Sequence, residues 1–123
     1  MHKILIVEDE DILREAYYAT LSSQGYQCDV AENGKVALEK CQTTTYDLIL
    51  LDLMMPVMSG VKFLEKFMPN VPDGTEVVVL SNLSSGVELE QAMDLGVYRC
   101  LLKSDVSPKE LVAAVRNELG DEG

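Results

Sequence analysis

Basic residues are scarce in this sequence: ten Lys and Arg stand against 21 Asp and Glu, and the formal net charge is −11. Nonspecific nucleic-acid binding needs a basic surface, and anionic membranes attract basic segments, so this composition argues against both kinds of partner. The excess of acidic residues also has a simple role in solubility. A local anion-binding pocket is still compatible with it, because one site need not follow the net charge.

Long hydrophobic runs are also missing. No stretch approaches the roughly 18 apolar residues that a membrane-spanning helix requires. The first residues, Met1–Lys3, lead straight into a strand-like segment, so we expect no signal peptide and a cytoplasmic location. A chain of 123 residues has the length of one ordinary domain, and we expect one domain over residues 1–123.

Cysteine and histidine are too few and too scattered to indicate a zinc site. Cys28, Cys41 and Cys100 form no CxxC pair, and we expect three buried thiols that behave as small hydrophobes. His2 is the only histidine, and we expect no catalytic or metal-binding role for it.

Short β-rich runs alternate with segments of helical period along the whole chain. This alternation is typical of βαβ units and of a parallel sheet covered by helices on both faces. With five helices, it predicts a doubly wound α/β domain in which the continuously apolar third strand is central. The expected strands are Lys3–Val7, Gln27–Ala31, Asp47–Leu51, Glu76–Leu80 and Tyr98–Leu102.

Polar residues indicate where the helices begin. Asn33 is expected to cap the second helix, and the third helix is expected over Val61–Met68. Ser85–Glu88 and Ser107–Glu110 have the spacing of capping boxes. The polar tail Gly120–Gly123 is expected to fray.

Three acidic side chains follow hydrophobic runs. Glu8 and Asp9 come directly after Ile4–Val7, and Asp52 comes directly after Leu48–Leu51. If both runs are parallel strands, their carboxyl ends lie side by side and bring the carboxylates together. Like charges at close range repel one another, so such a cluster is tolerable mainly with a cation, and oxygen ligands suit Mg²⁺.

Two further polar residues end apolar runs. Ser81 follows Val77–Leu80, and Lys103 follows Cys100–Leu102. An acid cluster, a hydroxyl and a cation on one sheet edge are typical of a site for a transferred phosphoryl group, and we expect one here. Each residue alone also has a simpler interpretation, as a helix-start acid, a turn aspartate, an N-cap serine or a solvated lysine.

In their order along the chain, these residues resemble the receiver domain of two-component response regulators. The resemblance covers Lys3–Leu119 and implies a flavodoxin-like five-stranded sheet of order 2-1-3-4-5, similar to single-domain chemotaxis regulators. The motifs are Glu8–Asp9, Asp52, the pair Pro56 and Gly60 in Pro-x-x-x-Gly, Ser81 and Lys103.

The resemblance implies a role for each acid. Asp52 corresponds to the aspartate that accepts a phosphoryl group from the phosphohistidine of a histidine kinase. Asp9, Asp52 and the backbone carbonyl of Met54 correspond to the Mg²⁺ ligands, and Glu8 to the acid that reaches the metal through water. Ser81 then corresponds to the switch hydroxyl and Lys103 to the phosphate partner.

The same resemblance implies partners. The expected donor is a histidine kinase or a phosphotransfer protein, and the expected target is a protein that contacts the fourth helix, fifth strand and fifth helix. A phosphorylation-dependent dimer also occurs in this family. The chemistry expected is Mg²⁺-dependent self-phosphorylation and slow self-dephosphorylation, without enzymatic turnover.

Several positions depart from the family pattern. Ser104 follows Lys103 where a cis proline is usual. A cis bond before serine costs about 2.5–4 kcal/mol, and the sequence leaves open whether this bond is cis or trans. Cys100 stands where the family usually has an aromatic residue that swings inward, and Tyr98 lies two residues earlier on the same strand. Asn82 stands where the family usually has a small residue. Met54 and Leu83 are apolar where polar groups position a hydrolytic water, which predicts slow loss of the phosphoryl group.

Two other functions fit part of the pattern. A phosphatase with an aspartyl nucleophile would need a general acid two residues after Asp52, where this chain has Met54. A pseudo-receiver would keep the fold as a protein-binding module and would not be phosphorylated.

Overall fold

The structure is a computed structural model that describes residues 2–82 and 86–121. Strands and helices alternate through the described chain. In order, the elements are β1 (Lys3–Val7), α1 (Asp11–Ser22), β2 (Gln27–Ala31), α2 (Gly34–Thr43), β3 (Leu48–Leu51), α3 (Gly60–Phe67), η1 (Met68–Asn70), β4 (Glu76–Ser81), α4 (Val87–Asp94), β5 (Arg99–Leu102), η2 (Lys103–Asp105) and α5 (Pro108–Leu119).

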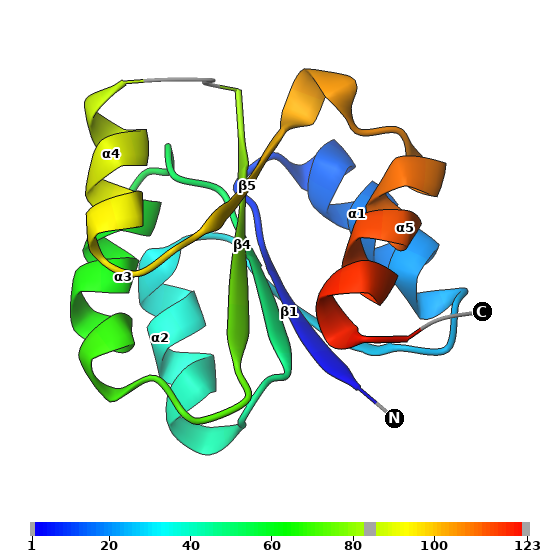
Figure 1. The fold of residues 1–123 in the computed structure, drawn as a ribbon, viewed down its shortest axis with the longest axis horizontal. Helices are drawn as coiled ribbons and strands as arrows, with labels where there is room; N and C mark the ends of the chain where they lie inside the picture. The colour runs from blue at the N-terminus through cyan, green and yellow to red at the C-terminus, as the bar shows by residue number, and fades with distance from the viewer. Residues whose placement is uncertain (1, 83–85, 122–123) are drawn as a thin grey trace.

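The five strands form one parallel sheet in the order β2-β1-β3-β4-β5. Helices α1 and α5 cover one face, and α2, α3 and α4 cover the other, as Figure 1 shows. The predicted fold class, strand order and central third strand are therefore confirmed. No helix among the described residues has the length and apolarity needed to cross a membrane.

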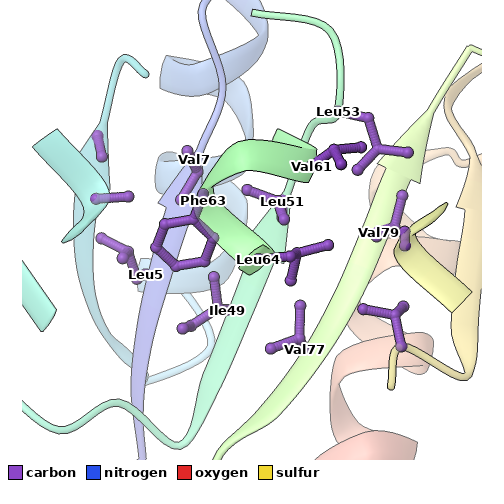
Figure 2. Packing of buried hydrophobic residues seen from close by; sticks show 14 of the residues in the cluster. Leu5, Val7, Ile49, Leu51, Leu53, Val61, Phe63, Leu64, Val77 and Val79 are labelled. Atoms are coloured by element: carbon purple, nitrogen blue, oxygen red, sulfur yellow. The ribbon is translucent and has the colours of Figure 1, made fainter. Parts of the chain in front are cut away.

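Alternate side chains of each strand enter two separate cores. Leu5 and Val7 of β1 face α2, α3 and α4, whereas Ile4 and Ile6 face α1 and α5. On the first side, Phe63 lies among the strand residues (Figure 2) and is fully buried. Burial on both faces explains why these strands read as unbroken apolar runs.

The expected element boundaries are correct to within one residue. β5 begins at Arg99 rather than Tyr98, β3 begins at Leu48, and β4 continues to Ser81. α3 covers Gly60–Phe67, one residue earlier than expected, and Met68 begins the short helix η1. Such shifts are normal, because hydrogen bonding and sequence pattern end elements at slightly different points.

The helix caps follow the sequence signals where they are described. Asn33 accepts a hydrogen bond from the backbone N–H of Val36 at 3.0 Å, and Ser107 and Glu110 form a reciprocal capping box. Both predictions are confirmed. Ser85 lies outside the described residues, and Gly86 is the N-cap of α4.

Two expectations were wrong. Cys100 is exposed, because the outer position on edge strand β5 leaves it uncovered, while Cys28 and Cys41 are half-buried. Within the tail Gly120–Gly123 that was expected to fray, Asp121 is held instead: its carboxylate bonds His2 Nδ1 at 3.0 Å and accepts from the Tyr26 hydroxyl at 3.1 Å, while residues 122 and 123 lie outside the described residues.

Gly60 lets α3 approach the end of β3 closely. A Cβ atom at this position would lie 2.3 Å from the carbonyl oxygen of Asp52 and 2.7 Å from Cα of Leu53. The Gly60 N–H also donates to the Leu53 carbonyl at 2.9 Å. Any larger residue would therefore push the backbone that carries Asp52.

We expect Gly60→Ala to lower the free energy of unfolding by about 3 kcal/mol, because the clash is with backbone atoms that cannot rotate away. Gly25→Ala is the control, since Gly25 has φ +92° and open space around it. That change should cost about 1–2 kcal/mol for the left-handed backbone alone. Urea denaturation of both variants measures these changes. If both variants lose the same free energy of unfolding, the close approach of α3 at Gly60 adds no cost of its own.

Candidate functional site

The sheet register brings the predicted acids together at the carboxyl ends of β1 and β3. Val7 pairs with Leu51, the residues that follow these strands are Glu8 and Asp52, and the Asp52 N–H donates to the Val7 carbonyl at 3.0 Å. The strand order reverses between β1 and β3, whose connections run to opposite sides of the sheet. Open α/β sheets bind ligands at such a reversal.

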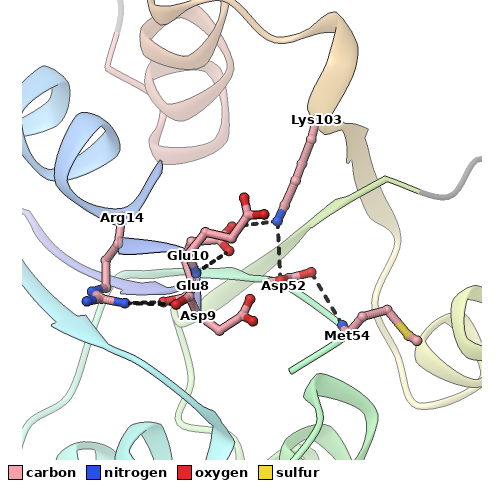
Figure 3. Close-up of polar contacts among 7 residues, drawn as sticks. All are labelled: Glu8, Asp9, Glu10, Arg14, Asp52, Met54 and Lys103. Atoms are coloured by element: carbon pink, nitrogen blue, oxygen red, sulfur yellow. Dashed lines mark hydrogen bonds and ion pairs between the residues drawn. The ribbon is translucent and has the colours of Figure 1, made fainter. Parts of the chain in front are cut away.

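Glu8, Asp9 and Asp52 each place one carboxylate oxygen within 4.8 Å of the other two. Glu8 is 1% exposed and Asp52 is 6% exposed, so water screens these charges little. Figure 3 shows the three carboxylates gathered at one edge of the sheet. The predicted cluster is therefore present.

Lys103 points into this cluster from the other side. It begins η2 directly after β5, and its Nζ lies 2.6 Å from Glu8 Oε1 and 3.2 Å from Asp52 Oδ2 (Figure 3). Its side chain is only 6% exposed. The buried ammonium thus links the carboxyl ends of β1, β3 and β5.

Burial and the neighbouring charge of Glu8 raise the pKa of Asp52 to about 6, although Lys103 opposes the shift. For Lys103, burial by itself lowers the pKa, but close contact with Glu8 and the negative charges of Asp52 and Glu8 raise it overall. Lys103 therefore stays positively charged at neutral pH. Within the cluster, the ionised form of Asp52 is unfavourable, because the positive charge of Lys103 does not fully offset its burial and the negative charge of Glu8.

The donor set fits a divalent cation. The buried Oε1 of Glu8 has its ion pair with Lys103 but receives no hydrogen bond of normal geometry from the described residues. Three carboxylates face one ammonium, so negative charge is left over. Carboxylate oxygens are the ligands that Mg²⁺ prefers, and a divalent charge would balance the excess.

Met54 lies beside Asp52 but contributes no polar side chain. Its N–H donates to Asp52 Oδ1 at 3.3 Å, and its thioether is 56% exposed. The role expected for its carbonyl as a metal ligand stays a prediction.

Ser81 ends β4 beside β5, where it pairs with Leu102, and it is fully buried. Because Lys103 directly follows Leu102, Ser81 lies close to the start of the lysine side chain. Its predicted role as the switch hydroxyl is untested.

The departures from the family pattern have visible consequences. The Lys103–Ser104 bond, which the sequence left open, is trans, since no cis peptide occurs in the described chain. Tyr98 is 68% exposed, and its hydroxyl lies 2.8 Å from carboxylate oxygens of both Glu76 and Glu118. Tyr98 therefore points to the surface. Asn82 is exposed, and Leu83 lies outside the described residues.

Sequence reasoning missed two residues near the cluster. Arg14 donates to the carbonyl of Glu8 at 2.9 Å, and Tyr17 is 8% exposed. Burial raises the pKa of the Tyr17 phenol, and the nearby Lys103 lowers it. The helical period of α1 places Tyr17 on the inner face but does not show that it lies near the cluster, and the backward reach of Arg14 has no periodic signal.

Comparison with known proteins agrees with this geometry. Residues 4–116 match the response regulator receiver domain family. The chain is 35% identical over 117 residues to response regulator ArlR of Staphylococcus saprophyticus, which covers 94% of this chain and 51% of that protein. It is 40% identical over 101 residues to the regulator of RpoS of Escherichia coli, covering 82% of this chain and 30% of that protein.

Solved structures give the same answer for the fold. The chemotaxis response regulator CheY4 of Vibrio cholerae superimposes with a TM-score of 0.87 at 28% identity, covering 97% of this chain and 99% of that one. The chain therefore belongs to the receiver domain family of two-component response regulators, which is a signalling family. The chain spans about half the length of response regulator ArlR and of other curated relatives, such as the transcriptional regulatory protein DltR of Streptococcus agalactiae.

We expect Asp52→Asn to stabilise the metal-free protein at neutral pH. A pKa of about 6 against an ordinary value of 3.8 means that ionising Asp52 opposes folding. The full shift corresponds to about 3 kcal/mol. Because Asp52 is buried and poorly screened, chemical denaturation at pH 7 should show a gain of up to about 3 kcal/mol.

The sign of this effect sets its pH dependence. A carboxyl with a raised pKa in the folded state stabilises the fold below its unfolded pKa and loses that contribution as pH rises through the folded pKa. The gain from Asp52→Asn should therefore be small below about pH 4 and complete above about pH 7. If the variant is less stable than the wild type at pH 7, the claim that ionised Asp52 destabilises the fold is wrong.

Proposed function

We propose that this domain, over residues 1–123, is a phosphorylation-controlled signalling module that accepts a phosphoryl group on Asp52. The observation that carries the proposal is the position of Asp52. It is buried at the strand-order reversal, beside two other acids and 3.2 Å from the ammonium of Lys103. The expected donor is a phosphohistidine on a histidine kinase or a phosphotransfer protein. The downstream target and the cytoplasmic location belong to the same proposal.

In the transfer step, a carboxylate oxygen of Asp52 attacks phosphorus and the P–N bond of phosphohistidine breaks. The bonding electrons return to the imidazole nitrogen, and histidine leaves neutral when its other ring nitrogen carries a proton. Glu8, Asp9 and Asp52 would hold Mg²⁺. When bound, this ion neutralises charge on the carboxylates and on the phosphoryl oxygens.

Lys103 provides the fixed positive charge on the opposite side of Asp52. Because its Nζ already lies 3.2 Å from Asp52 Oδ2, a small movement lets it pair with a phosphoryl oxygen on that carboxylate. The Ser81 hydroxyl, at the end of β4, is our candidate for a second donor to these oxygens. Its movement would alter the loop after β4 and so the face formed by α4, β5 and α5.

That face is our proposed contact surface for a downstream protein or for a second phosphorylated copy. On this face Cys100 and Tyr98 are exposed, and Cys100 stands where the family usually has an aromatic residue that swings inward. Neither nucleic acid nor membrane is a proposed direct partner, since the chain has an excess of 11 negative charges.

Incubation with Mg²⁺ and acetyl phosphate should add one phosphoryl group per chain, detected by intact-protein mass spectrometry. Asp52→Asn should abolish the adduct, and removal of Mg²⁺ with EDTA should suppress it in the wild type. Beryllofluoride with Mg²⁺ should bind in the same place as a stable mimic.

The other functions give different outcomes in this experiment. A phosphatase would release inorganic phosphate continuously, and a pseudo-receiver would form no adduct at all. An adduct that persists in Asp52→Asn would refute Asp52 as the acceptor.

We also expect slow hydrolysis of the aspartyl phosphate, lasting minutes or longer. Met54 is apolar and half-exposed, so it provides no acceptor to orient an attacking water next to Asp52. Met54→Asn should shorten the lifetime, measured as loss of the mass adduct after the donor is removed. Met93→Asn is a control, since Met93 is 57% exposed on α4. A wild-type lifetime of seconds would contradict this expectation.

A further inference from the structure

The guanidinium of Arg14 reaches back from the first turns of α1 to the loop that carries Glu8 and Asp9. Its Nη1 donates to the carbonyl of Glu8 at 2.9 Å and, over a longer 3.4 Å, to the carbonyl of Asp9. Its Nη2 pairs with the carboxylate of Asp11, and the side chain is 16% exposed. Figure 3 shows Arg14 on the side of the loop away from Lys103.

α1 begins without an ordinary side-chain cap. α2, α3 and α5 each begin with a side-chain cap, from Asn33, Ser59 and Ser107. At α1 the N-cap is Glu10, whose side chain makes no cap hydrogen bond. The loop before α1 is held instead by Arg14, together with the bond from the Glu10 N–H to Glu8 Oε2 at 3.1 Å.

The two carbonyls that Arg14 binds belong to the two residues whose carboxylates enter the acidic cluster. Fixing a residue's carbonyl limits rotation of its peptide group, and this limits the directions open to its side chain. A guanidinium suits this role because its donors lie in a rigid planar fork. Repulsion among Glu8, Asp9 and Asp52 would otherwise drive the loop away from Asp52.

We propose that Arg14 is a positioning residue for the cation site, which holds Glu8 and Asp9 in place before Mg²⁺ arrives. The inference rests on the proposed function, because it assumes that these acids bind Mg²⁺. Arg14 touches neither the cation nor the phosphoryl group in this account. Its contribution is to keep two mutually repelling carboxylates at the spacing that the ion requires.

If Arg14 acted only through its charge, replacing it would change the Mg²⁺ affinity in the opposite direction from the loss of a positioning residue. A nearby guanidinium repels a divalent cation, so simple removal of its charge would tighten Mg²⁺ binding. The ion pair with the exposed carboxylate of Asp11 weakens that repulsion. The sign of the change in affinity therefore separates the two effects.

The experiment is a titration of the full chain with MgCl₂, followed by calorimetry and tyrosine fluorescence, for the wild type, Arg14→Met and Arg14→Lys. We expect Arg14→Met to raise the dissociation constant about tenfold, as for other residues that orient metal ligands. Arg14→Lys keeps the charge and one point donor but loses the fork, so its affinity should fall between the two.

Two matched controls should leave the dissociation constant within about twofold of the wild type. Arg116→Met removes a guanidinium on α5 that bonds Gln24, away from the cluster. Asp11→Asn removes the ion pair of Arg14 and leaves its backbone hydrogen bonds in place. Amide hydrogen exchange at Asp9 and Glu10 in the metal-free protein should be faster in Arg14→Met, which tests the loop without any metal.

Tighter or unchanged Mg²⁺ binding in both Arg14 variants would overturn the proposal. Lower stability with an unchanged dissociation constant would also overturn it, since Arg14 would then be a structural residue only. If Arg14→Met fails to fold, Arg14→Lys decides the matter by the same criteria. A wild type that binds no Mg²⁺ would overturn the cation site itself, and this inference with it.

Discussion

The buried contact of Lys103 with Glu8 and Asp52 is the interaction on which the rest of the site depends. The ammonium contacts two of three clustered carboxylates in a place where water screens charge poorly. Burial and the neighbouring charge of Glu8 raise the pKa of Asp52 to about 6 and make its ionised form unfavourable. The negative charge of the cluster favours a divalent cation and keeps Asp52 close to a positive group, so a local cost in stability is coupled to the proposed chemistry.

The fold imposes this arrangement because each participant follows a buried strand. The pairing of Val7 with Leu51 fixes Glu8 beside Asp52, and the pairing of Ser81 with Leu102 brings Lys103 to the same edge. Two hydrophobic cores, one on each face of the sheet, hold the strands in register against the repulsion. Gly60 completes the support by letting α3 pack directly on the backbone of Asp52.

Much of this was predictable, since strand ends are visible as the last apolar residue of a run. That rule located Glu8, Asp9, Asp52 and Lys103, and the apolarity of β3 predicted its central place. The strand order itself came from the resemblance, because periodicity does not say which strands are neighbours. Arg14 was not predictable: a side chain that reaches backward to carbonyl groups leaves no pattern in the sequence. Likewise, the exposure of Cys100 depends on the edge position of β5, and the bonds of Asp121 depend on His2 far away in the chain.

The most direct test of the account is a Mg²⁺ titration followed by backbone amide NMR of the wild-type domain. The account predicts saturable shifts centred on the residues that follow β1, β3 and β5, in particular Asp9, Asp52 and Lys103, and their loss in Asp52→Asn. Shifts that are absent, or spread evenly over the acidic surface, would contradict a built cation site and the phosphoryl-accepting role that rests on it.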